Sequence, residues 1–264
     1  MEIFFNLLVF VFGCCIGSFS NVCIYRWHVG TSVIKERSHC DTCGAKINWY
    51  DNIPILSYIL LRGKCRNCHT QLSLQYPFVE LLTGLVFLAI YYTLGNTILT
   101  AKLMFVSWLF IVATVSDILY YEVPDELTVI SVPVMIFLAL IGETSWFDLA
   151  LGVFAPGLFL WLFIIISDFF TDKIILGGGD AKFMFCIGGI MGAGFSMSVL
   201  LIGCLAIALI YFSFFIEDIV SHKQTYVPML VGFATAYFLI LMSEYLTTPK
   251  VDVLNALLSI LTFA

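Results

Sequence analysis

Eight long apolar runs divide this chain, and one polar segment interrupts them. The runs cover residues 1–25, 77–95, 98–116, 127–142, 146–167, 183–195, 197–217 and 227–246. Most approach the roughly 20 residues that a helix needs to cross a bilayer, whereas 127–142 and 183–195 are shorter. Only 11% of the 264 residues are charged, against about 25% in a typical soluble domain. The pattern predicts an all-α polytopic membrane protein with about eight transmembrane helices.

The two ends of the chain each require an interpretation. Residues 1–25 resemble a signal peptide in hydrophobicity, but Glu2 stands where a signal peptide is positively charged, and no small-residue cleavage site precedes Arg26. We therefore expect a retained first transmembrane helix. The apolar tail 252–264 is too short to span a bilayer, and we expect it to lie at the membrane interface.

The distribution of basic residues predicts the orientation in the membrane. Seven of the twelve lysine and arginine residues lie in the polar segment 26–76, which is therefore expected to be cytoplasmic, with the N-terminus outside. Counting spans onward also places the loops 117–126, 168–182 and 217–226 in the cytoplasm. Three further lysines agree with this orientation, and two are minor exceptions. The lysines that agree are Lys173, Lys182 and Lys223, and the exceptions are Lys102 and Lys250.

The polar segment contains two C-x-x-C pairs separated by 21 residues. Cys40, Cys43, Cys65 and Cys68 supply four thiolates in a spacing close to that of a zinc ribbon. Disulfides are the alternative, but a reducing cytoplasm disfavours them. We expect a structural zinc ion, because four cysteines fill the coordination shell. His39 and His69 stand beside the pairs and could each replace a cysteine, but we interpret them as bystanders.

Three parts of the chain follow from these patterns. Residues 1–25 form transmembrane helix 1, residues 26–76 form a small cytoplasmic zinc-ribbon-like insertion, and residues 77–264 form a membrane-embedded domain. The basic residues of 26–76 are too few and too mixed with acids to indicate nucleic-acid binding, and lipid headgroups are the expected partner.

Acidic residues gather at the predicted cytoplasmic edge in two stretches, "VSDILYYEVPDELT" and "SDFFTDKIILGGGDAK". Asp180 follows three glycines and could simply cap a helix that starts at Ala181. Asp125 could cap a helix from Glu126 onward in the same way. Asp117 has no such explanation, because a carboxylate at the C-terminus of a helix opposes the helix dipole. Its position therefore points to another role.

Asp117 and Asp180 could form a catalytic pair on one face of the membrane. Two carboxylates in close contact share one proton, so one can take a proton from water while the other donates to a carbonyl oxygen. Plain helix capping and a proton path through a transporter are the alternatives. A transporter places its acids near the bilayer midplane, and these acids are near the edge.

Four motifs, in order along the chain, resemble the bacterial type IV prepilin peptidases, a family of GxGD-type aspartic proteases. They are "GSFSNVCIYR" (17–26), the two C-x-x-C pairs, "YPFVELLTG" (76–84), and the pair "SDILYYEVPDELT" and "GGGDAK". The resemblance covers residues 13 to about 190. Beyond that, only hydrophobicity matches.

The resemblance implies roles for particular residues. Asp117 and Asp180 would be the catalytic aspartates, and Gly177 and Gly179 would form the active-site turn. Asp125 also lies in the first of these two motifs, and we assign the role to Asp117 because capping explains Asp125 better and Asp117 lies where the helix ends. The substrates would be prepilins of type IV pili or pseudopilins of type II secretion, cut after a glycine at the cytoplasmic face of the bacterial inner membrane. Relatives with the cysteine segment also methylate the new N-terminus with S-adenosylmethionine. A peptidase without methylase activity and a non-enzymatic assembly scaffold remain the alternatives.

The residues of the methylase site stay open at this stage. Glu80 is an acid on an apolar run and could belong to that site, or it could pair with a base such as Arg26. Gly17, Ser18 and Asn21 are small or polar residues on the first run, and we interpret them as positions of close helix packing.

Overall fold

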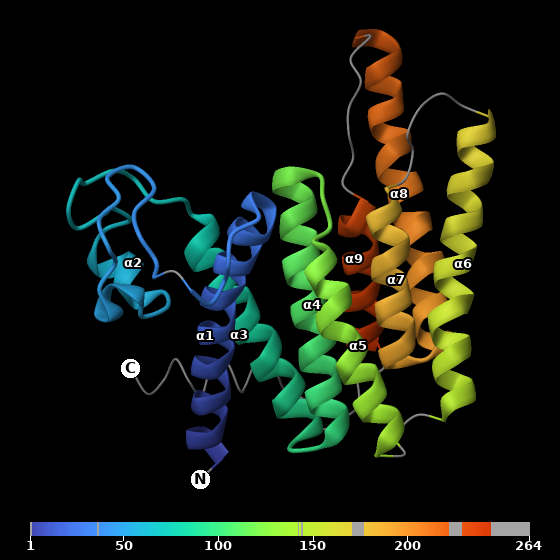
Figure 1. Ribbon diagram of the computed structural model, residues 1–264, viewed down its shortest axis with the longest axis horizontal. Coiled ribbons are helices and arrows are strands. Elements are labelled where there is room, and N and C mark those ends of the chain that lie inside the picture. Colours follow the sequence, from blue (N-terminus) through green and yellow to red (C-terminus); the bar gives the residue numbers. More distant parts are fainter. Residues whose placement is uncertain are drawn as a thin grey trace. The chain divides into compact units, whose positions relative to one another are not determined.

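The computed structural model describes residues 2–35, 37–141, 143, 145–170, 177–221 and 229–243, with side chains except those of 167–170 and 208–221 (Figure 1). Within these ranges the fold is all-α and contains no strand. The residues fall into two compact units, a first unit that includes residues 1–112 and a second unit of residues 113–243. Helix α4 (Ile98–Tyr120) begins in the first unit and ends in the second.

Each predicted apolar run corresponds to a helix. In the described part of the chain, the helices that match the eight runs are α1 (Glu2–Val29), α3 (Gln75–Leu94), α4, α5 (Asp125–Leu140), α6 (Trp146–Phe170), α7 (Gly178–Met191), α8 (Ala193–Ser221) and α9 (Met229–Leu241). Among the parts that the structure describes, α1, α3, α4 and α6 are long and apolar enough to cross a membrane. The others include shorter apolar helices. The fold is therefore that of the expected all-α polytopic membrane protein.

Some predictions concern residues that the structure does not describe. The tail 252–264, Lys173, Lys223 and Asp172 lie outside the described residues. The proposed orientation in the membrane stays a prediction.

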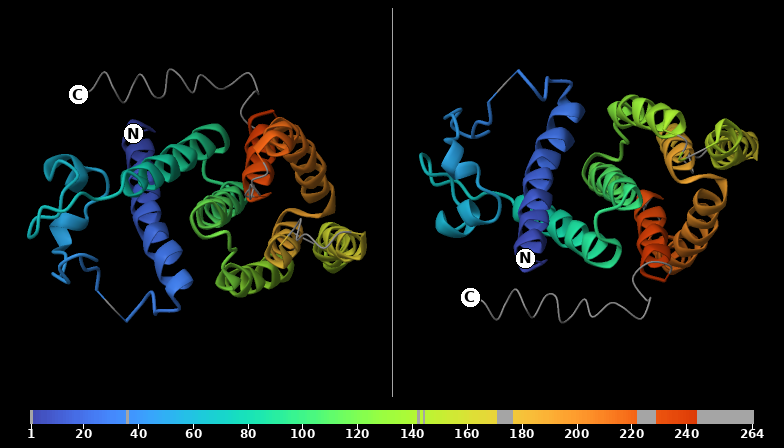
Figure 2. Two further views of the ribbon diagram at one scale, coloured as in Figure 1. Left: turned by 90° about the horizontal axis from the view of Figure 1, so that it is seen from above. Right: turned by 90° about the horizontal axis from the view of Figure 1, so that it is seen from below.

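Helices α1 and α3 form the core of the first unit, where they lie against each other and cross (Figure 2). Two glycines of α1 make the crossing possible. A Cβ atom on Gly13 would lie 2.8 Å from Cα of Gly84, and one on Gly17 would lie 2.6 Å from Cα of Glu80. Because the neighbouring atoms are backbone, they cannot move aside as a side chain does. The small residues of the first run therefore serve close packing, as expected.

Polar side chains strengthen the same crossing. The Asn21 side-chain amide donates to the backbone carbonyl of Tyr76 at 3.1 Å and accepts from the Gln75 side chain at 3.3 Å. The Trp108 indole of α4 donates to the Ser20 hydroxyl at 2.9 Å. These bonds join helices of the first unit at buried polar positions, where an unpaired group would be costly.

The segment between α1 and α3 contains the short elements η1 (Trp49–Asn52) and α2 (Leu56–Leu60). Two isolated antiparallel bridges, His39 with Lys46 and Lys64 with Gln71, close two small hairpins. Each hairpin carries one C-x-x-C pair at its turn. The insertion between the first two long helices thus has the two-knuckle form that the cysteine spacing predicts.

In the second unit, helix α7 lies among α5, α6 and α8, and α8 packs along α9 (Figure 2). Gly152 of α6 and Gly188 of α7 meet backbone to backbone, so these two helices approach closely. Helix α7 has only 14 residues, and most of its side chains are buried. Its N-terminus carries Asp180 in a densely packed surrounding.

Candidate active site and metal centre

Asp117 lies in the last turn of α4 and is buried, with 8% of its surface exposed. Its Oδ2 accepts a hydrogen bond from the backbone N–H of Leu230 at 3.0 Å. Leu230 is in the first turn of α9, so Asp117 opposes the dipole of its own helix but is stabilised by the N-terminal N–H groups of another. Sequence reasoning missed Leu230, because it lies 113 residues away and carries no chemical signature.

Asp180 lies in the first turn of α7 and is 6% exposed. Its Oδ2 accepts the backbone N–H of Gly177 at 3.2 Å, so the carboxylate caps the helix from its third position and not, as expected, from the position before the helix. The helix begins at Gly178, earlier than the predicted Ala181, and the carboxylate bonds back toward the residue that precedes the helix. Capping accounts for one lone pair of Asp180 and leaves the others available.

The two carboxylates belong to the same unit and are close enough for their charges to repel each other. Each is buried, and each has a single recorded backbone donor. Two buried acids in such proximity do not both ionise easily. The predicted residues from separate stretches of sequence therefore come together at one place in the fold.

The glycines before Asp180 serve close approach. Gly177 has a φ of −81°, and neither Gly178 nor Gly179 has a positive φ. The turn therefore does not use the left-handed conformation that favours glycine. A Cβ atom on Gly179 would lie 3.0 Å from Cβ of Val123, in the segment that follows Asp117. The absence of a side chain at Gly179 lets the two acidic stretches approach each other.

Asp125 has a different environment from the buried pair. It is the first residue of α5, its side chain is 71% exposed, and its Oδ1 accepts from Nζ of Lys182 at 2.8 Å. The expected capping of α5 is replaced by this surface ion pair with α7. A solvated, paired carboxylate is a poor candidate for proton sharing, which favours Asp117 over Asp125.

The four cysteines of the first unit converge on one point. Their Sγ atoms all lie within 4.8 Å of one another, in a group that could hold a metal ion. The Cys40–Cys68 Sγ distance is 3.8 Å, far longer than the roughly 2.05 Å of a disulfide. Zinc–sulfur bonds of about 2.3 Å in a tetrahedron place the sulfur atoms about 3.8 Å apart. The donor set and this spacing both fit zinc.

The two knuckles repeat one backbone pattern. Gly44 N–H donates to the carbonyl of Cys40, and His69 N–H donates to that of Cys65. Both residues have positive φ, 68° and 57°. Gly44 and His69 thus occupy matching places in the two knuckles. Among the residues described, neither His39 nor His69 joins the metal-binding group.

Backbone N–H groups also prepare the first knuckle for metal. Those of Cys43 and Thr42 lower the pKa of the Cys40 thiol, and that of Ala45 lowers the pKa of Cys43. A lowered thiol pKa favours the thiolate, which is the form that binds zinc. In the second knuckle, burial and hydrogen bonds with the other cysteines raise the pKa of Cys68 to about 11, so the metal site is inferred from the geometry of the sulfur atoms and not from the thiol pKa values.

An ion pair fixes the second knuckle to η1. The Arg66 guanidinium makes bidentate hydrogen bonds of 2.6 to 3.1 Å to Asp51 and lies 5.5 Å from the centre of the Tyr50 ring. The adjacent guanidinium lowers the pKa of Asp51. The stretch between the two knuckles is thereby held against the cysteine group.

Comparison with known proteins shows that two family models match parts of this chain. "Bacterial Peptidase A24 N-terminal domain" matches residues 11–94, and "Type IV leader peptidase family" matches residues 103–213. The first match covers the cysteine segment with its flanking helices, and the second covers both aspartates. No solved structure shows a significant match to this chain.

Similar curated proteins carry the name "Prepilin leader peptidase/N-methyltransferase". The one from Myxococcus xanthus is 35% identical over 189 residues, which are 71% of this chain and 56% of the relative. The one from Vibrio cholerae is 31% identical over 255 residues, 90% of this chain and 98% of the relative. The one from Bacillus subtilis is 33% identical over 201 residues, 74% and 79% respectively. The likeness extends over nearly the whole length of one relative.

Proposed function

Because this chain belongs to the type IV leader peptidase family, we propose that it is a membrane aspartic endopeptidase that removes the leader of prepilins or pseudopilins. Cleavage follows a glycine at the cytoplasmic face of the bacterial inner membrane. The enzyme then methylates the new N-terminal amine, as the names of its relatives suggest. The substrate's hydrophobic helix stays in the lipid while its extended leader reaches the acids.

Asp117 and Asp180 are the proposed catalytic residues. The observation that carries this proposal is the burial of two carboxylates, from α4 and α7, near enough to repel each other. The ionised member takes a proton from the attacking water, and the protonated member donates to the oxygen of the scissile carbonyl. The Leu230 and Gly177 N–H groups hold the two side chains in place during this exchange.

The proposal also includes two bound groups, a metal ion and a methyl donor. Cys40, Cys43, Cys65 and Cys68 would hold a structural zinc ion that stabilises the segment between α1 and α3. S-adenosylmethionine would supply the methyl group for the second reaction. The zinc has no catalytic part, since four thiolates leave no open coordination position.

The experiment is mass spectrometry of a prepilin incubated with the purified full-length protein, with and without S-adenosylmethionine. We expect cleavage after the leader glycine in both samples and one added methyl group only with the methyl donor. An uncleaved prepilin in an active preparation would contradict the peptidase proposal. Cleavage without any methylation would restrict the function to that of a peptidase.

A further inference from the structure

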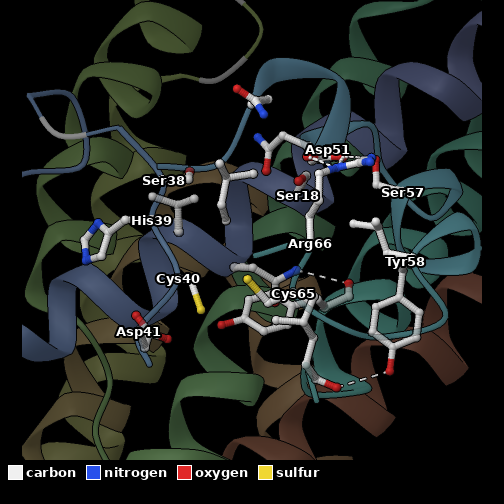
Figure 3. Close-up of a pocket in the computed structure, with 18 of the residues that line it drawn as sticks. Ser18, Ser38, His39, Cys40, Asp41, Asp51, Ser57, Tyr58, Cys65 and Arg66 are labelled. Carbon is white, nitrogen blue, oxygen red and sulfur yellow. Dashed lines mark hydrogen bonds and ion pairs between the residues drawn. The ribbon is translucent and has the colours of Figure 1, made fainter. Parts of the chain in front are cut away.

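The first unit contains a cavity of about 390 Å³ that is not part of the aspartate site (Figure 3). It lies between the cysteine segment and helices α1 and α3, and its lining includes Ser18, Cys40, Asp51, Cys65 and Glu80. All lining residues belong to the first unit. A volume of this order suits an organic ligand of drug or cofactor size.

Glu80 is the unusual group in this cavity. It lies on the apolar helix α3, is 8% exposed, and lines the cavity wall. Its Oε2 accepts the backbone N–H of Ile55 at 2.7 Å. None of the ion pairs recorded for the described residues includes Glu80, so the expected pairing with a base is not observed there. Burying a carboxylate without a cation is costly.

Ile55 presents its N–H to Glu80 from a strained backbone. Its φ is 61° and its ψ −52°, a conformation that a β-branched residue rarely adopts. Strain of this kind is found where surrounding structure maintains a functional arrangement. The segment between the two knuckles is therefore held so that one of its N–H groups fixes the Glu80 carboxylate at the cavity wall.

Aromatic side chains line the same cavity. Tyr25 comes from α1, Tyr76 from α3 and Tyr58 from the short helix α2. The Tyr58 hydroxyl donates to the carbonyl of Leu72 at 3.2 Å, which fixes its ring (Figure 3). Aromatic rings with a buried carboxylate favour a positively charged group on the ligand. The rest of the lining also carries basic side chains, so this preference applies to the part of the wall beside Glu80; the basic residues are Arg26, Lys46 and Arg66.

We propose that this cavity binds the methyl donor, with Glu80 facing its positively charged sulfonium group. The inference rests on the methylation part of the proposed function, and it adds the site and the recognition group. In the reaction, the lone pair of the substrate amine forms the new N–C bond, and the electrons of the broken S–C bond return to sulfur. The products are a neutral thioether and a methylated ammonium, which releases a proton to water.

The first test compares binding of S-adenosylmethionine with that of S-adenosylhomocysteine, its neutral thioether product, by the purified full-length protein. We expect Glu80→Gln to weaken binding of the sulfonium compound by about tenfold or more and that of the thioether far less. Glutamine still accepts the Ile55 N–H, so the local fold stays intact. Glu80→Asp keeps the charge and should retain part of the preference for the sulfonium.

A second pair of variants tests the location independently of charge. Ile53→Trp places a large ring in the cavity and should abolish binding of both compounds while prepilin cleavage continues. Ile59→Trp is the matched control, because Ile59 is in the same segment, is 63% exposed, and is not among the cavity residues. Unchanged zinc content in each variant verifies that the segment is folded.

The outcomes separate this inference from the proposed function. Equal loss of both compounds in Glu80→Gln, or unchanged binding of the sulfonium, would overturn the role of Glu80. Unchanged binding in Ile53→Trp would overturn the location, even though the wild type methylates its substrate. A wild type that cleaves but neither binds the donor nor methylates would instead refute the methylation part of the proposed function, and this inference with it.

Discussion

Gly179 and Val123 approach so closely that a methyl group on the glycine would lie 3.0 Å from Cβ of the valine. Each residue is a near neighbour of one proposed catalytic aspartate along the chain. Gly179 directly precedes Asp180, and Val123 follows Asp117 by six residues. This contact therefore sets how nearly the two acidic stretches can meet.

Gly179→Ala should lower the rate of prepilin cleavage by about tenfold, because overpacking at this contact costs about 1–3 kcal/mol and displaces Asp180. The nearest atom is the valine Cβ, so Val123→Gly should restore part of the activity, whereas Val123→Ala should restore less. Cleavage rates of the single and double variants test this.

Gly178→Ala is the matched control for that experiment. A Cβ atom at Gly178 has no neighbour within 4 Å, so this variant should cleave at close to the wild-type rate. Equal losses in Gly178→Ala and Gly179→Ala would mean that backbone freedom matters here, and the close-approach explanation would be wrong.

Asp125→Asn should retain substantial cleavage activity and lose little stability. Its ion pair with Lys182 is exposed on both sides, and such pairs contribute about 0–1 kcal/mol. Cleavage assays and thermal unfolding of the purified variant check both expectations. Complete loss of cleavage with the protein still folded would move the catalytic role from Asp117 to Asp125.

Metal analysis of the carefully purified protein should find about one zinc ion per chain. Removal of zinc with a strong chelator should lower methylation more than cleavage, because Cys40 and Cys65 line the cavity, whereas both aspartates belong to the second unit. Parallel assays of the two activities on one preparation measure the difference. Absence of bound metal, or a loss confined to cleavage, would contradict this assignment.

Gly17→Ala should weaken the packing of α1 against α3 by about 1–3 kcal/mol, because the added Cβ would lie 2.6 Å from the backbone of Glu80. A lower midpoint of thermal unfolding and a selective fall in methylation are the expected results. Cys15→Ala on the exposed side of the same helix is the control and should change neither. Similar effects of the two substitutions would contradict the packing account.

Much of the fold follows from hydrophobic patterning. All eight apolar runs are helices, and the two that begin just after acidic clusters are α5 and α7. The cysteine spacing predicted the two knuckles, because C-x-x-C pairs impose local geometry that does not depend on the rest of the chain. Periods and spacings of this kind are local, so sequence alone predicts them.

The contacts that complete each site are not local. The N–H of Leu230 reaches Asp117 across 113 residues, and the N–H of Ile55 reaches Glu80 across 25. Backbone donors have no residue-type signature, so no motif announces them. The helix dipole argument marked Asp117 as unusual but could not identify the second helix end that stabilises it.

The most direct test of the catalytic pair is the cleavage rate of Asp117→Asn and Asp180→Asn, each inserted, folded and retaining zinc. Each variant should lose cleavage almost completely, because neither remaining carboxylate can both activate water and protonate the carbonyl oxygen. S-adenosylmethionine binding should persist in both. Full processing of the prepilin by either variant would contradict the assignment of Asp117 and Asp180 as the catalytic residues.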